Sequence, residues 1–129
     1  MRTLHLNLTK KWFDMILSGV KTEEYREIGR ENEYWEKKLL QCHKDLGTPQ
    51  SKSQCKKMQC QRCIFESNGG EFQKYDTITF SNGYSKNRRQ FVIELRKISV
   101  HEGLEEWGAR KRTLYFVMSL GDVLSSNCS

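Results

Sequence analysis

The sequence of 129 residues lacks the features that mark membrane and secreted proteins. Its longest apolar runs, such as residues 91–93, are only a few residues long, far short of the roughly 20 needed to span a bilayer. Residues 1–8 lack the apolar segment of a secretory signal peptide. Hydrophobic residues make up 36% of the chain, below the roughly 45–50% of a typical globular domain. These absences favour a soluble, cytoplasmic protein with a small core and no membrane partner.

The chain also lacks an even set of cysteines, because it has five. Without a secretion signal, a disulfide framework is the weaker interpretation, and we expect reduced thiols. Four of the cysteines, with His43 beside the first, can hold a structural zinc through thiolates. These candidate metal ligands are Cys42, Cys55, Cys60 and Cys63. Only the last two have the C-x2-C spacing of a zinc knuckle, so a flexible basic loop with free thiols is the alternative.

Charge is abundant and is distributed unevenly along the chain. Lys and Arg number 22 against 16 Asp and Glu, which gives a net charge of +6 and favours a polyanionic partner. Residues 86–112 carry eight cations, whereas residues 23–36 are mostly acidic. The positive charge is therefore expected on one side of the molecule.

Hydrophobic periodicity predicts a strand, a helix and a second strand in the first 27 residues. Residues 3–8 alternate strictly, as a half-buried strand does. An amphipathic helix follows, with Thr9 as its predicted N-cap, Trp12 among its core residues and Gly19 as its stop. Residues 21–27 then form a strand that places Glu24 and Arg26 on one face and Tyr25 on the other.

The rest of the chain predicts a short helix, a long loop and three more strands. The helix is expected at 32–40, the loop at 41–70, and the strands at 75–80, 89–100 and 113–120. Asn82-Gly83 is a strong turn signal between the first two of these strands. Alternating strands that outnumber helices predict an α+β fold: a small, partly closed β-barrel with one or two flanking helices. We expect one domain over residues 1–129, with an insert at about 41–71.

The stretch "LSGVKTEEYRE" resembles the signature of the ASCH domain, whose pattern can be written S-G-x-K-T-x-E-x-R. ASCH domains are small β-barrels related to the PUA domain of RNA-modification enzymes. The specified positions are filled by Ser18, Gly19, Lys21, Thr22, Glu24 and Arg26. The segments "YDTITFSNGY", "FVIEL" and "YFVMSLGDVL" are also similar to this family, so the resemblance covers about residues 3–40 and 72–125. It implies a PUA-like (ASCH) barrel, as in small ASCH-domain proteins of bacteria and phages.

The resemblance implies a cleft in which the motif residues bind RNA, or a single nucleotide or nucleoside. Lys21 can pair with a phosphate, Arg26 can clamp a phosphate or a base edge, and Glu24 can accept a hydrogen bond from an exocyclic amine. Thr22 adds a hydroxyl next to them. The alternative is a set of exposed ion pairs worth less than about 1 kcal/mol each.

Glu94 is the second acidic candidate, because it interrupts an otherwise apolar strand. In some small bacterial members of the family, a Lys, a Thr and a Glu hydrolyse the amide of N4-acetylcytidine. Lys21 and Glu94 match two of these by position, but Glu24 stands where the Thr belongs. We therefore expect little turnover of N4-acetylcytidine and retained binding of cytidine-like ligands.

A ribonuclease acting on single-stranded RNA is a further alternative, since some members of the family are thought to have that activity. A Lys and a Glu can serve as acid and base at a phosphodiester, with catalytic candidates Lys21, Glu24 and Glu94. Tyr25 and Tyr34 are additional candidates for the assisting hydroxyl. Cutting of labelled RNA by the pure protein would separate this alternative from simple binding.

The turn after residue 80 combines an aromatic side chain with several cations. Such a combination can stack a base and hold its phosphates, and the alternative is an ordinary solvated hairpin tip. The candidate nucleic-acid-binding residues in this turn are Asn82, Tyr84, Lys86, Arg88 and Arg89.

Overall fold

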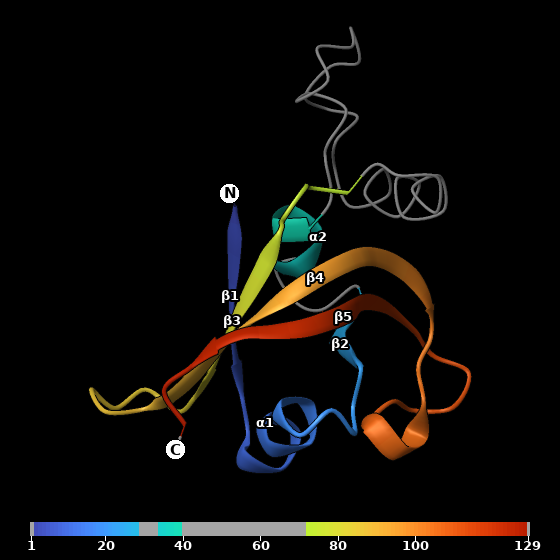
Figure 1. Ribbon diagram of the computed structural model, residues 1–129. Coiled ribbons are helices and arrows are strands. Elements are labelled where there is room, and N and C mark those ends of the chain that lie inside the picture. The colour runs from blue at the N-terminus through green and yellow to red at the C-terminus, as the bar shows by residue number, and fades with distance from the viewer. Residues whose placement is uncertain (1, 29–33, 40–71, 129) are drawn as a thin grey trace, which may run out of the picture.

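A computed structural model of the chain describes residues 2–28, 34–39 and 72–128 (Figure 1). The insert predicted at 41–71 lies outside the described residues, and so do its candidate zinc ligands, Cys42, Cys55, Cys60 and Cys63. The zinc site therefore stays a prediction. None of the described helices is long and apolar enough to cross a membrane.

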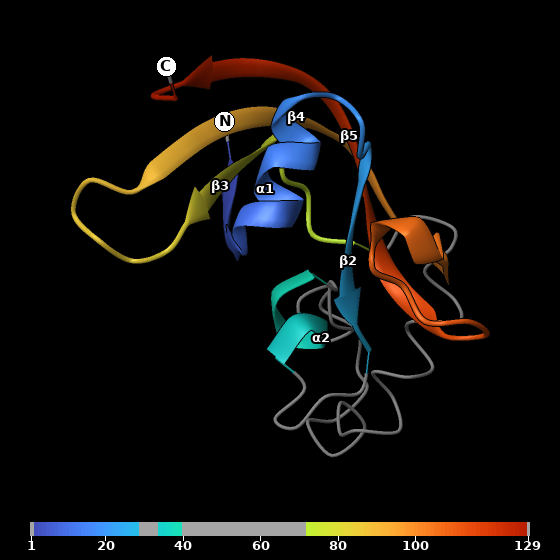
Figure 2. The same ribbon diagram turned by 90° about the horizontal axis from the view of Figure 1, so that it is seen from below.

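The fold is a mixed sheet of five strands in the spatial order β1-β3-β4-β5-β2. β1 runs parallel to β3, and the other neighbouring pairs are antiparallel. The long strands β4 and β5 bend strongly, so the sheet curls into a half-barrel around helix α1 (Figures 1 and 2). The strands are β1 (Thr3–Leu8), β2 (Glu23–Glu27), β3 (Thr77–Asn82), β4 (Arg89–Glu102) and β5 (Leu114–Ser126). The prediction of a small α+β barrel is confirmed at this level.

β-Bulges explain the bend of the two long strands. The register between β4 and β5 shifts at three places between Val92 and Lys97, and bulges of this kind bend a strand and increase its twist. Gly121 lies at this bend, where a Cβ atom would overlap the Glu94 carboxylate. The sequence predicted a strand that ends at residue 120, which is wrong, because β5 passes through Gly121 and pairs with β4 as far as Ser126.

Helix α1 (Lys10–Leu17) fills the hollow of the half-barrel with its apolar face. Phe13 and Ile16 are fully buried, and the centres of the Phe13 and Phe91 rings lie 4.8 Å apart. Thr9 occupies the predicted N-cap position in an extended conformation, but its side chain makes no capping hydrogen bond. Gly19 has φ of +86°, which allows the chain to turn directly from the helix toward β2.

Alternating side chains on the inner face of the sheet form the core, as the sequence predicted for residues 3–8. Leu4, Leu6 and Leu8 are buried on β1, and the inward residues of the other strands pack with them. The main contributors are Ile78, Phe80, Phe91, Ile93, Leu95, Phe116 and Met118. Burial of such apolar side chains stabilises a fold by roughly 1.5–3 kcal/mol each.

Two short helical segments flank the sheet. α2 (Tyr34–Leu39) lies within the helix predicted at 32–40, and its Leu39 is completely buried. A single 3-10 turn, η5 (Glu105–Trp107), lies in the connection from β4 to β5. Both segments lie beside the edge strand β2 in Figure 2, the strand that carries the motif residues.

Candidate functional site

Three charged motif residues form a buried cluster, which we call the triad: Lys21, Glu24 and Arg26. Lys21 Nζ lies 2.8 Å from Glu24 Oε1, and Arg26 Nη2 lies 2.7 Å from Glu24 Oε2. Lys21 is 3% exposed and Glu24 is 5% exposed. One carboxylate therefore holds two cations, and the triad keeps a net charge of +1.

The register of β2 against β5 explains why Glu24 and Arg26 face the interior. Glu24 lies opposite Met118, and Arg26 lies opposite Phe116. Because directly paired residues point to the same face of a sheet, and Met118 and Phe116 are core residues, Glu24 and Arg26 also point to the inner face. Tyr25, between them, faces the other side and packs against Tyr115. The predicted division of β2 into two faces is confirmed.

Arg26 also connects the two edge strands of the half-barrel. Its Nη2 donates to the backbone carbonyl of Asn7 on β1 at 3.2 Å, so the side chain spans the seam between β2 and β1. Arg26 Nε is buried and has no hydrogen-bond partner among the described residues. An unpaired buried donor is costly, and it is available for an acceptor on a ligand after a small rearrangement.

Aromatic rings surround the two cations of the triad. Lys21 Nζ lies 4.4 Å from the centre of the Trp12 ring, and the Arg26 guanidinium lies 5.0 Å from that of Trp35. Contacts of this kind attract a cation to a ring face and partly replace the lost hydration. The sequence predicted Trp12 as a core residue; it does pack against the core, but it is only partly buried and lines a pocket.

This pocket, the triad pocket, has a volume of about 280 Å³ and lies at the seam of the half-barrel. It is lined by the triad and Trp12, by residues 7–9 at the end of β1 and the start of α1, and by Trp107 of η5. Gly108 has φ of +98°, and a Cβ atom there would lie 2.9 Å from the Trp12 ring. Glycine is therefore required where the turn after η5 touches Trp12.

The hydroxyl of Tyr25 is held on both sides, although its ring lines the triad pocket. It donates to Glu23 Oε1 at 2.8 Å and accepts from the Leu104 N–H at 3.0 Å. Burial of the ring, with the Glu23 carboxylate close by, raises the pKa of Tyr25 well above the ordinary value for tyrosine. The hydroxyl is therefore a poor proton donor at neutral pH, which disfavours Tyr25 as an acid catalyst.

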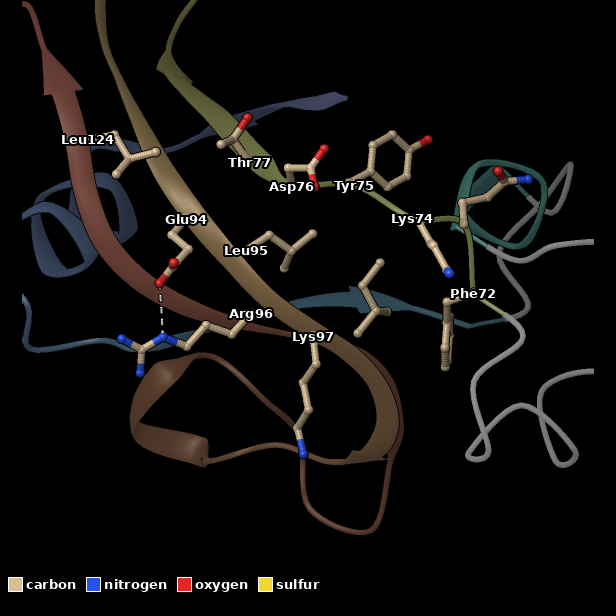
Figure 3. A pocket seen from close by; sticks show the side chains of 12 residues that line it. Phe72, Lys74, Tyr75, Asp76, Thr77, Glu94, Leu95, Arg96, Lys97 and Leu124 are labelled. Atoms are coloured by element: carbon tan, nitrogen blue, oxygen red, sulfur yellow. Dashed lines mark hydrogen bonds and ion pairs between the residues drawn. The ribbon is translucent and has the colours of Figure 1, made fainter. Parts of the chain in front are cut away.

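Glu94 lies in a different pocket, on the opposite face of the sheet. Ile93 and Leu95 point into the core, so Glu94 between them points outward and forms an ion pair with Arg96 at 3.1 Å (Figure 3). The pocket in Figure 3 has a volume of about 600 Å³ and is also lined by Lys74 and Asp76. Thr22 is exposed and does not line the triad pocket either. The structure therefore does not bring Glu94 together with the triad, and Thr22 shares a different pocket with Lys21 alone of the triad.

The predicted binding residues in the β3–β4 hairpin have different surroundings from one another. Asn82 is structural, because its side chain donates to the Leu8 carbonyl at 3.0 Å. Arg89 forms an ion pair with Asp14 at 2.8 Å, and the hydrogen bonds of Asp14 with Lys10 and Arg89 lower its pKa. Of the predicted residues, Tyr84 and Lys86 are exposed at the hairpin tip, and Arg88 is half-buried.

Three residues at the mouth of the triad pocket were not predicted as ligand contacts from the sequence: Asn7, Trp107 and Arg110. Arg110 Nη2 lies 3.0 Å from Glu27 Oε1 at the rim. Asn7 lies on β1, whereas Trp107 and Arg110 lie in the connection from β4 to β5, and no local spacing relates Asn7 to the other two. The dense charge and aromatic content of "EEWGARKR" is the one signal that could have suggested two of them.

Comparison with known proteins gives no match for this chain: no family model, no curated protein and no solved structure is significantly similar to it.

Proposed function

We propose that this protein is a PUA-like barrel of the ASCH family that binds RNA by holding one nucleotide or nucleoside unit in the triad pocket. The observation that carries the proposal is the buried triad, with its net positive charge, in a pocket lined by aromatic rings. The positions that the S-G-x-K-T-x-E-x-R signature assigns to Lys, Glu and Arg converge on this pocket, which supports the family assignment.

The cost of burying charge supports a binding role over a structural one. Removing three charged groups from water costs several kcal/mol per ion, and apolar residues of similar size often stabilise a fold equally well. Two cations that share one carboxylate leave a positive charge that a phosphate, or a carbonyl oxygen of a base, can offset. The triad is therefore better suited to receiving a ligand than to stabilising the fold.

The volume of the triad pocket and the residues that line it indicate which ligands it suits. A volume of about 280 Å³ is just below the roughly 300–1,000 Å³ of small-molecule sites, so the pocket suits a ligand no larger than a single base or nucleoside. The partly buried Trp107 offers a ring surface on which a flat base can stack, whereas Lys21 and Lys11 already lie over the Trp12 ring. The exposed cations of the hairpin belong to the basic surface that would steer the rest of an RNA strand.

Binding is favoured over hydrolysis. Both oxygens of Glu24 already accept hydrogen bonds from cations, and Glu94 lies in the pocket of Figure 3. A hydrolase would need a second acidic or nucleophilic group beside Lys21. We therefore expect little or no release of cytidine from N4-acetylcytidine, and no cutting of RNA.

A calorimetric titration with nucleoside monophosphates and a short single-stranded RNA tests the proposal. Wild-type protein should bind both, and RNA affinity should fall as salt rises, because phosphate contacts release counterions. Lys21→Gln should weaken binding of the monophosphate at least tenfold, whereas Lys74→Gln, which removes an exposed charge from the pocket of Figure 3, should leave it unchanged.

Circular dichroism of both variants would establish that they are folded. Absence of binding to all probes would reject the proposal. A loss of affinity in Lys74→Gln alone would place the ligand in the other pocket.

A further inference from the structure

A second pocket adjoins the triad pocket on the outer side of β1. Its volume is about 330 Å³. It is bounded by the outward-facing side of β1 and by the β3–β4 hairpin, and none of the described residues that line it is acidic. The lining residues with side-chain chemistry are His5, Asn7, Ser81, Tyr84, Arg88 and Gln90.

Asn7 separates the two pockets and lines both. Its backbone carbonyl accepts from Arg26 of the triad at 3.2 Å, and its side-chain amide donates to the Gly83 carbonyl of the hairpin at 2.7 Å. Asn7, on the edge strand β1, is thus the boundary between the triad pocket and the second pocket. A strand of nucleic acid that leaves the triad pocket across β1 enters the second pocket directly.

The walls of the second pocket offer the groups that bind a nucleotide. Tyr84 is 88% exposed, the largest exposure among the exposed large hydrophobic side chains of the described residues, and an exposed ring beside cations is a stacking surface for a base. Arg88 lines the pocket, and Lys86 lies next to it in the hairpin. Neither of them forms an ion pair within the part of the chain that the structure describes. Arg88 Nη1 donates to the backbone carbonyl of Ser85 at 3.2 Å, which leaves the charge of the guanidinium without an acidic partner and open to a phosphate.

The pocket of Figure 3 also has cations and an aromatic ring, but the acidic Asp76 and Glu94 line it beside Lys74 and Lys97. Arg96 there is paired with Glu94, and the Tyr75 ring is covered by Arg2 at 4.5 Å. These groups are therefore already engaged by the protein itself.

We propose that the second pocket binds the neighbouring nucleotide of a single strand, with its base stacked on Tyr84 and the linking phosphate held by Arg88. This inference rests on the proposed function, since the first nucleotide occupies the triad pocket. It adds a requirement for a flexible single strand, because paired and stacked bases cannot reach two pockets on either side of β1. It also means that Tyr84 and Arg88 contribute to the binding of a longer strand but not to the binding of a mononucleotide, which occupies only the triad pocket.

The test compares a nucleoside monophosphate with the matching dinucleotide and tetranucleotide, as RNA and as DNA, by calorimetry at one salt concentration. The dinucleotide should bind wild-type protein about tenfold more tightly than the monophosphate, the gain expected from one stacked base. Tyr84→Ala should abolish this gain and leave the monophosphate affinity unchanged, while Tyr84→Phe should retain it. Leu124→Ala, which truncates another exposed apolar side chain, is the matched control.

Arg88→Gln should lower the affinity for the tetranucleotide and reduce its salt dependence by about one phosphate contact. If the monophosphate binds but the longer strands gain nothing, or if Tyr84→Ala keeps the gain, the second pocket is not a nucleotide site. If neither monophosphate nor strand binds, the triad pocket itself fails as a nucleotide site. A duplex that competes as well as the single strand would also overturn the inference.

Discussion

Two strands of this protein carry the same Glu-x-Arg spacing in opposite environments. Glu24 and Arg26 on β2 lie 2.7 Å apart on the inner face, with side chains 6% and 19% exposed. Glu94 and Arg96 on β4 lie 3.1 Å apart on the outer face, 45% and 60% exposed. The difference lies in the face of the sheet that the two charged residues share. On β2 the residue between the charges, Tyr25, points outward, so Glu24 and Arg26 point inward. On β4 the residue between the charges, Leu95, points into the core, so Glu94 and Arg96 point outward.

The inner pair differs from the outer pair in its neighbours as well as in its burial. Lys21 adds a second cation to the inner carboxylate, and the rings of Trp12 and Trp35 lie against the two cations. The outer pair is largely open to solvent. The same sequence spacing therefore gives an ion pair two different environments, which depend on the residues packed around it.

The largest effect is expected from Glu24→Gln. This change leaves Lys21 and Arg26 buried without their shared carboxylate, which should lower the free energy of unfolding by about 3–5 kcal/mol. Urea unfolding at neutral pH, followed by tryptophan fluorescence, measures it. Glu94→Gln is the matched control, and its cost should stay below about 1 kcal/mol because the outer pair is exposed. Equal losses in the two variants would contradict the contrast between the pairs.

An intermediate effect is expected from Gly108→Ala. The new Cβ atom would lie 2.9 Å from the Trp12 ring, and alanine is strained at φ of +98°. Together these should cost about 1–3 kcal/mol of stability. They should also weaken nucleotide binding, because Trp12 must shift within the triad pocket.

Gly83→Ala separates the two causes of this loss. Gly83 has φ of +85°, but no other atom lies within 4 Å of the position that a Cβ atom would take there, so only the backbone strain applies. Thermal unfolding of the two variants should show the larger loss for Gly108→Ala. A larger loss for Gly83→Ala would mean that the contact with Trp12 is not tight.

The smallest effect is a loss of stability at alkaline pH that depends on Tyr25. Its pKa is raised in the folded protein, so the folded state keeps this proton after the unfolded state has lost it. The contribution is complete below about pH 10, the unfolded value, and stability falls as the pH rises above it. In an ultraviolet titration of phenolate, Tyr25→Phe should lose one late-titrating tyrosine. An unchanged late phase would show that the Tyr25 hydroxyl is not held between Glu23 and Leu104.

Much of the fold followed from local patterns in the sequence. The alternation of Leu4, Leu6 and Leu8 predicted β1, and the stripe around Phe13 and Ile16 predicted α1, because burial of one face determines both periodicities. The continuation of β5 beyond residue 120 was not predictable, since it depends on bulges in β4 and on a close contact between Gly121 and Glu94. Contacts between distant segments leave no local signal.

The candidate site was partly predictable for the same reason. Lys21, Glu24 and Arg26 are close in sequence, and the alternation of β2 placed the last two on one face. The outward direction of Glu94 depends on the pairing of β4 with its neighbours, so its sequence position alone did not separate it from the triad. Asn7 and Arg110 enter the pocket from other segments and were missed.

NMR mapping of a bound nucleotide tests the central claim most directly. On titration with a nucleoside monophosphate, the amide resonances of residues 21–27 and the indole N–H resonances of Trp12 and Trp107 should shift in proportion to occupancy. The amide resonances of residues 94–97 should not shift, because the Glu94–Arg96 pair lies in a separate pocket. Shifts confined to residues 94–97, or no shifts at a nucleotide concentration well above that of the protein, would contradict the assignment of the triad pocket as the binding site.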